Sequence, residues 1–172
     1  MKIILSKYNP KWAKLFEQER ELLLRTLNSY VSKIEHIGST SIEGMLSKPI
    51  IDIMVGLNNF SEADGLVPKI ANLGYSYFPE FEDVMPDRRF FKKITNGQAT
   101  HHIHMVEIND EFWQRHLLFR DYLRNNPSIA REYAELKKYL AKQDWEVSND
   151  FAKAKTEFIQ RIEVIAKESY IV

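Results

Sequence analysis

The chain has 172 residues, the usual size of one domain. Its 24 basic and 24 acidic residues balance, which argues against a protein that coats nucleic acid or an anionic membrane, since both functions require excess positive charge. There is no cysteine, which excludes disulfides, thiol catalysis and thiolate metal sites. No basic leader opens the chain, and its apolar runs are too short to cross a bilayer. We therefore expect a cytoplasmic globular protein that is not bound to a membrane.

The first part of the chain alternates helical and extended patterns. Pro10 suits a first helical position, and apolar residues then recur at helical spacing, which predicts a helix over residues 10–28. Residues 30–37 are typical of a strand. A polar break and a short turn or helix over 43–46 follow. Residues 50–55 are almost continuously apolar, which is the pattern of a strand covered on both faces.

The middle of the chain predicts one helix and three further strands. Ser61 and Asp64 resemble a capping box, the start of a helix that ends at Gly74. Asn96 and Gly97 both tolerate positive φ and mark a tight hairpin. The strands expected around these signals are residues 75–78, 89–95 and 100–107.

The last third of the chain is helical. We expect one helix over residues 111–124, a second to about residue 143, and a third from Ser148 or Asn149. The whole order predicts an α+β protein of one domain, 1–172. Its sheet-containing core would occupy residues 1–109, with the helical part, 110–172, packed on it.

A glycine-serine turn followed by a carboxylate in an apolar strand is the most informative stretch. Gly38 permits a tight turn whose N–H groups and hydroxyls suit phosphate oxygens. Asp52 is costly in an apolar strand unless it is paired or bound to a metal, and a carboxylate of this kind suits Mg²⁺. The alternative is an ordinary loop, with Asp52 capping a backbone group. The candidate phosphate contacts are Gly38, Ser39, Thr40, Ser41 and Lys48.

Three of the five histidines lie within four positions. His102 and His104 would face the same side of a strand, and His101 the other. The pair could bind Zn²⁺ or another transition metal, act as general acid or base, or contact a substrate phosphate. The alternative is that they are packed histidines whose hydrogen bonds go to the backbone.

A basic cluster with two phenylalanines precedes the histidines. Arginine binds phosphate bidentately, and an aromatic ring can stack on a nucleobase. The alternative is an edge strand protected by charge. The candidate anion contacts in this cluster are Arg89, Lys92 and Lys93.

The ordered set of motifs resembles the GrpB-like family, also called UPF0157, of the nucleotidyltransferase superfamily. The motifs are YNPKW at 8–12, EHIGSTS at 35–41, KPIIDI at 48–53, RRFFKK at 88–93, THHIH at 100–104 and FRDYLR at 119–124. This resemblance implies a nucleotidyltransferase-like mixed sheet with flanking helices and a site at the Gly-Ser turn and the aspartate strand.

One position departs from the pattern of active superfamily members, which carry a second carboxylate two residues after the first. Met54 stands there. Glu107 could stand where the third superfamily carboxylate lies and, with Asp52, hold the metal. Glu35 or Glu43 could also supply an oxygen.

These features predict that the protein binds a nucleotide or another phosphorylated small molecule. In an enzymatic version, Asp52 holds Mg²⁺, His102 or His104 orients or deprotonates the acceptor, and a nucleotidyl group is transferred. Two alternatives stay open: a module that binds a nucleotide or coenzyme without turnover, and a metal-dependent enzyme centred on the histidines.

Overall fold

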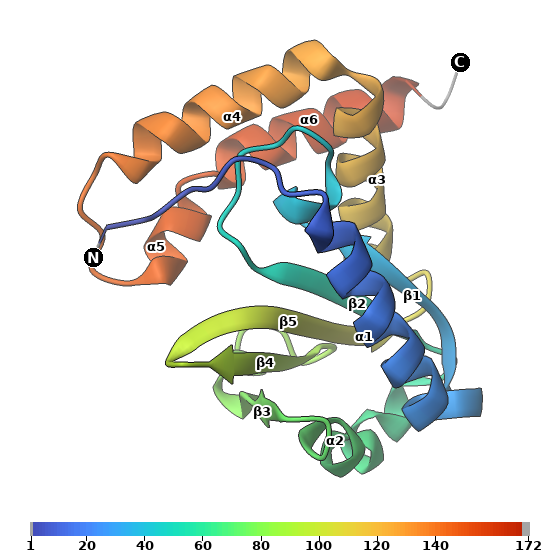
Figure 1. Ribbon diagram of the computed structural model, residues 1–172. Coiled ribbons are helices and arrows are strands. Elements are labelled where there is room, and N and C mark those ends of the chain that lie inside the picture. The colour runs from blue at the N-terminus through green and yellow to red at the C-terminus, as the bar shows by residue number, and fades with distance from the viewer. Residues whose placement is uncertain (1, 170–172) are drawn as a thin grey trace.

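Five strands form one mixed sheet in the computed structural model, which describes residues 2–169 (Figure 1). The strand order is β1-β2-β5-β4-β3, in which β2 and β5 run parallel and the other neighbours antiparallel. The α+β class expected from the sequence is confirmed. The strands are β1 Val31–Ile37, β2 Ile51–Leu57, β3 Tyr75–Tyr77, β4 Arg89–Thr95 and β5 Gln98–Glu107.

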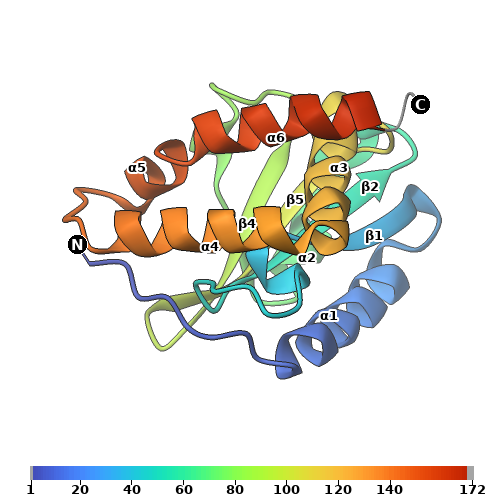
Figure 2. The same ribbon diagram turned by 90° about the horizontal axis from the view of Figure 1, so that it is seen from above.

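Helices cover both faces of the sheet. Helices α1 and α2 pack on one face of the sheet, and α3 packs on the other. Helices α4 and α6 pack against α3 and run alongside each other (Figures 1 and 2). Among residues 2–169, no helix combines the length and the apolar character needed to cross a membrane. The helices are α1 Lys11–Leu27, α2 Ala63–Ala71, α3 Glu111–Asn125, α4 Pro127–Ala141, α5 Ser148–Lys153 and α6 Thr156–Ser169.

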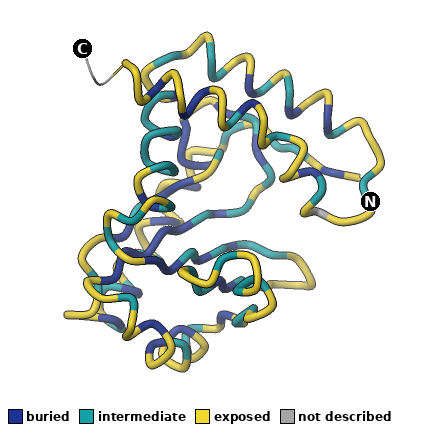
Figure 3. Tube along the Cα trace, turned by 180° about the vertical axis from the view of Figure 1, so that it is seen from behind, coloured by how far each residue is buried: buried dark blue, intermediate teal, exposed yellow. Residues whose placement is uncertain are grey.

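Alternation along the strands divides the sheet between a core and a site. On β2, Ile51 and Ile53 pack into the core beneath α1 and α2, so Asp52 and Met54 face the opposite side. The buried, dark blue part of the trace follows these central strands (Figure 3). Strands β2 and β5 pair in parallel, in a register that places Asp52 opposite His102 and Met54 opposite His104.

Local signals predicted most boundaries, with two differences. The hairpin is confirmed, since Asn96 and Gly97 have φ of 52° and 75°. The capping box is wrong, because Asn59 accepts the hydrogen bond from the Ser61 N–H and the helix begins at Ala63. The last predicted helix is two helices, α5 and α6, with a break at residues 154–155.

Candidate functional site

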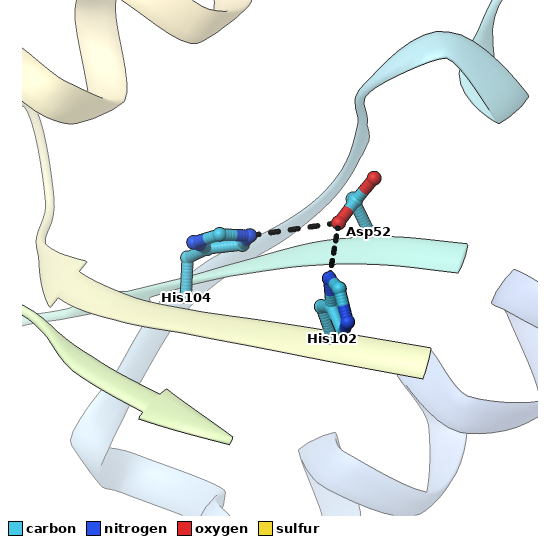
Figure 4. Close-up of side chains that lie close together, drawn as sticks. All are labelled: Asp52, His102 and His104. Atoms are coloured by element: carbon cyan, nitrogen blue, oxygen red, sulfur yellow. Dashed lines mark hydrogen bonds and ion pairs between the residues drawn. The ribbon is translucent and has the colours of Figure 1, made fainter. Parts of the chain in front are cut away.

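Asp52 lies between His102 and His104, and both imidazoles point to the same carboxylate oxygen (Figure 4). His102 Nδ1 is 3.2 Å from Asp52 Oδ1, and His104 Nε2 is 3.6 Å from it. All three side chains are partly exposed. The structure thus brings together the three residues that the sequence proposed as catalytic.

Gly38 is required at its position because Asp52 lies directly against it. Its φ is +70°, and a Cβ atom there would be 2.5 Å from Asp52 Oδ2. Any side chain would therefore be strained in its backbone and would also collide with the carboxylate. The tight turn expected at Gly38 thus also makes room for the aspartate.

Hydrogen bonds determine the charge of Asp52 and the tautomer of His104. Burial alone would raise the pKa of Asp52, but hydrogen bonds from His102 and His104 hold it below its ordinary value. Burial lowers the pKa of His104. Arg88 Nη1 is 3.3 Å from His104 Nδ1, and a guanidinium can only donate. His104 therefore accepts through Nδ1 and keeps its proton on Nε2, toward Asp52.

A cavity of about 640 Å³ opens at Asp52. One part of its wall is apolar, formed by residues such as Phe81, Val84, Met85 and Phe90. Of the described residues that line it, only Asp52 carries a carboxylate. The cationic residues that line it are Lys48, Arg88, Lys92, Lys137, Lys153 and Lys155. Six of the chain's 24 basic residues therefore line this one cavity, against a single carboxylate among the described lining residues.

Lys137 of α4 is the most deeply buried of these cations, with 2% of the residue exposed. Its Nζ donates to Ser39 Oγ at 2.9 Å and to the Leu46 carbonyl, and it lies 4.8 Å from the centre of the Tyr133 ring. Within residues 2–169, no carboxylate forms an ion pair with it. Burial, aided by the charge of Lys155, lowers the pKa of Lys137 to about 7.

Two further lysines share one aromatic ring. The Nζ atoms of Lys48 and Lys155 lie 4.9 and 4.5 Å from the centre of the Phe151 ring. Burial and the charge of Lys48 lower the pKa of Lys155 to about 8, and burial lowers the pKa of Lys48. An anion in the cavity would stabilise the protonated form of each lysine, so these groups favour an anionic ligand.

The predicted anion contacts of β4 divide between the two faces of the sheet. Phe90 and Lys92 lie opposite His104 and His102, and Lys92 lines the cavity. Lys93 faces the other side, where its Nζ is 2.6 Å from Glu19 Oε1.

Arg89 and Glu107 also lie away from Asp52. Arg89 Nε donates to Asp64 Oδ1 at 2.7 Å. Glu107 lies five residues beyond His102 along β5, where its carboxylate accepts the Phe60 N–H at 3.0 Å. The structure does not bring Glu107 to Asp52 as a metal ligand.

The hydroxyls of the Gly-Ser turn have unequal access to the cavity. Ser39 and Thr40 line it, but Thr40 Oγ1 already donates to the Ile50 carbonyl. Ser41 Oγ donates to the Gly38 carbonyl, and its own carbonyl accepts two hydrogen bonds from Arg124. The Ser39 hydroxyl also lines the cavity, where it contacts Lys137 Nζ and the Tyr133 hydroxyl.

The other proposed oxygen ligands also lie elsewhere. The Glu35 carboxylate accepts from Arg120 Nη1 at 2.7 Å. Glu43 lines a second cavity, of about 670 Å³, which shares Thr40 with the first and is also lined by Arg124 and Arg131. Asp52 does not line this second cavity.

Sequence reasoning missed four cationic residues that line the cavity: Arg88, Lys137, Lys153 and Lys155. Lys137 carried a signal, because it shares the buried face of α4 with Tyr133 and Leu140, and a lysine in an apolar stripe is unusual. Arg88 belongs to the basic cluster at residues 88–93, but nothing in that pattern distinguishes it from its neighbours. Lys155 carried no local signal, since it lies at the break between α5 and α6.

The donor set suits a transition metal better than Mg²⁺. A pair of Mg²⁺ ions requires several carboxylates, whereas Met54 fills the second carboxylate's position and is fully buried with Ile37, Val106 and Trp113. Asp52, His102 and His104 each place a ligand atom within 4.8 Å of the other two. One carboxylate and two imidazoles are typical ligands of zinc and its neighbours.

Sequence comparison gives a family match over most of the chain. The model of the family described as GrpB protein matches residues 2–164. The UPF0157 protein YqkA of Bacillus subtilis is 41% identical over 166 residues, which are 96% of this chain and 48% of that protein. The chain therefore spans about half the length of this relative.

Structural comparison supports the same grouping. The crystal structure of the conserved protein GrpB from Enterococcus faecalis matches with a TM-score of 0.88 and 35% identity, over 98% of this chain and all of that one. The structure of Cid1 in complex with its short product ApU matches with a TM-score of 0.55 and 16% identity, over 80% of this chain and 43% of that one. The second match shows a shared fold. The resemblance to the GrpB family drawn from the motifs is confirmed.

Proposed function

The chain belongs to the GrpB family, and we propose that its cationic cavity binds a phosphorylated small molecule of the nucleotide type. The observation that carries this proposal is the lining of the cavity at Asp52, where six cationic residues face one carboxylate. Among these residues Lys137 is buried and forms no ion pair with a described carboxylate. A buried positive charge of this kind is costly, and an anionic ligand beside it removes this cost.

The cavity wall carries both cationic and apolar residues, which favours a ligand with one anionic and one apolar end. Lys137 and Ser39 lie at one part of the wall, with Lys155 and Lys48 close by on Phe151. These groups suit phosphate oxygens. Phe81, Phe90 and their apolar neighbours suit an organic group such as a base. A cavity of about 640 Å³ has the size of small-molecule sites.

Binding, rather than nucleotidyl transfer, is the function that the geometry supports best. Active members of the superfamily that the motifs resemble carry a second carboxylate two residues after the first, and here that position is Met54, packed with Trp113. In the proposed complex, Lys137 and Lys155 would neutralise phosphate oxygens, with Ser39 holding the Lys137 ammonium in place through its hydroxyl oxygen. His102 and His104 keep Asp52 ionised and in place through their hydrogen bonds.

Calorimetric titration with a nucleotide panel tests this proposal. The protein is freed of metal with a chelator and titrated with ATP, ADP, AMP, inorganic pyrophosphate and adenosine. We expect affinity to rise with phosphate number, pyrophosphate to bind, and adenosine to bind far more weakly than ATP. Equal affinity for adenosine and ATP, or no binding of any phosphorylated compound, would refute the proposal.

Two neighbouring lysines of α4 provide the variant and its control. Lys137 is buried in the site, whereas Lys138 is half exposed and pairs with Glu135. We expect Lys137→Met to weaken ATP binding by about tenfold or more, because a hydrogen bond to a charged group contributes about 1.5–3 kcal/mol. Lys138→Met should leave the affinity unchanged. An equal effect of both changes would mean that ATP binds to the general surface charge.

A further inference from the structure

We propose that Asp52, His102 and His104 hold one transition-metal ion of the Zn²⁺ or Co²⁺ type. This inference goes beyond the binding of a phosphorylated ligand, and it is tested without one. It rests on the positions of three side chains and on the residue that replaces the second carboxylate.

The three ligand atoms are already spaced for a small ion. Asp52 Oδ1 is 3.2 Å from His102 Nδ1 and 3.6 Å from His104 Nε2 (Figure 4). A tetrahedral ion at about 2.0–2.1 Å from each ligand would place neighbouring ligand atoms roughly 3.3 Å apart. The two measured separations lie on either side of that value, and the two imidazole nitrogens lie within 4.8 Å of each other. Binding requires the imidazoles to turn from the carboxylate oxygen toward a shared ion.

The strands hold these side chains in register. Asp52 of β2 is paired with His102 of β5, and His104 follows two residues later on the same face. Met54, on the same face of β2, packs with Val106 and Trp113 and closes one side of the site with apolar atoms. Two imidazoles and one carboxylate leave an open coordination position toward the cavity, as in catalytic zinc sites.

Arg88 competes with the metal for His104. A metal bound at Nε2 requires the proton of His104 on Nδ1, but Arg88 Nη1 donates to Nδ1 at 3.3 Å. The guanidinium is held over the rings of Phe90 and Phe112, at 5.1 and 5.7 Å from their centres. Metal entry therefore requires Arg88 to withdraw from Nδ1. Arg88 and the nearby lysines oppose the cation, so we expect moderate affinity.

Cobalt titration of the tag-free, chelator-treated protein tests the site. Visible absorption reports Co²⁺ bound by nitrogen and oxygen ligands, and Zn²⁺ is measured by competition with it. We expect one Co²⁺ per chain. His102→Gln and His104→Gln should each weaken binding by at least about tenfold, since even the loss of an outer partner costs about 10–100-fold. Arg88→Met should tighten binding.

His101→Gln is the matched control, because His101 lies on the same strand but faces the other side of the sheet, where Thr100 Oγ1 is 2.9 Å from its Nδ1. It should bind Co²⁺ as the wild type does. Failure of the wild type to bind Co²⁺, or an equal loss in His101→Gln, would overturn the site. Unchanged or weaker Co²⁺ binding by Arg88→Met would refute the proposal that Arg88 competes with the metal for His104.

A measurement on the wild type covers the case of a variant that does not fold. Bound Co²⁺ should shift the imidazole proton signals of His102 and His104 strongly and those of His101 much less. Larger shifts at His101 would place the metal elsewhere. Because these tests use metal without phosphorylated compounds, and the nucleotide titrations use metal-free protein, either proposal can fail without the other.

Discussion

Replacing Gly38 with alanine is expected to displace Asp52 and to disable the site. The added Cβ would lie 2.5 Å from Asp52 Oδ2 and 3.1 Å from both its Cβ and Cγ atoms. These atoms belong to a short side chain whose other oxygen faces His102 and His104. The carboxylate cannot move away from the new methyl group without changing its contact with the two imidazoles.

The expected cost has two parts. The backbone at Gly38 has φ +70° and ψ −176°, a region that is essentially restricted to glycine, and a side chain there costs about 1–3 kcal/mol. Displacing Asp52 weakens hydrogen bonds to a charged group, at about 1.5–3 kcal/mol. The first part lowers the free energy of unfolding, and the second also lowers affinity for any ligand that Asp52 contacts.

Gly44→Ala separates the two parts. Gly44 also has positive φ, +78°, but nothing lies within 4 Å of a Cβ added there. Urea unfolding should show that both variants lose stability, and calorimetric titration should show that only Gly38→Ala loses affinity for Co²⁺ and pyrophosphate. If Gly38→Ala binds both as well as Gly44→Ala does, Asp52 is not the centre of the site.

Three further predictions concern charge. Because the pKa of Lys137 falls from 10.5 to about 7 on folding, the unfolded chain binds more protons between these values. The stability of the wild type relative to Lys137→Met should therefore rise with pH from 7 toward 10, by at most about 1.4 kcal/mol per pH unit. A constant difference in urea unfolding across this range would contradict that. Burial lowers the pKa of His36 from 6.5 to about 4, so the wild type should lose stability as the pH falls from 6.5 to 4. The variant His36→Gln should lose less stability over the same range. Equal acid sensitivity of the two proteins in thermal unfolding would contradict this. Arg89→Met breaks ion pairs with Asp64 and Glu82 and a hydrogen bond to the Pro86 carbonyl, so it should lower the unfolding free energy. It should leave pyrophosphate affinity unchanged in calorimetry, because these contacts lie away from Asp52. A loss of pyrophosphate affinity in this variant would mean that Arg89 takes part in ligand binding.

Local patterns predicted the parts of the molecule that depend on neighbouring residues. The Asn96-Gly97 hairpin follows from backbone preferences, and the two-residue alternation placed His102 and His104 on one face. Asp52 stood out because a carboxylate interrupts an apolar strand. Its contact with the histidines depends on the parallel pairing of β2 and β5, which joins segments about 50 residues apart and leaves no local signal.

The cationic wall could not be predicted for the same reason. Lys137 reaches Ser39 across 98 residues of sequence, and Lys155 comes from the break between two helices. On β4, the antiparallel pairing with β5 turns Lys92 toward the site and Lys93 toward Glu19, a choice that the sequence alone left open. Tertiary packing, rather than local propensity, assembles this part of the cavity.

Lysine-resolved NMR during a pyrophosphate titration tests the central claim most directly. Single Lys→Arg replacements assign the Cε signals of Lys137 and Lys155 in the cavity and of Lys138 and Lys142 on the surface. The account predicts that pyrophosphate raises the pKa of Lys137 and Lys155 and shifts their signals, while Lys138 and Lys142 stay unchanged. Equal shifts of all four lysines, or shifts of the surface pair alone, would contradict it.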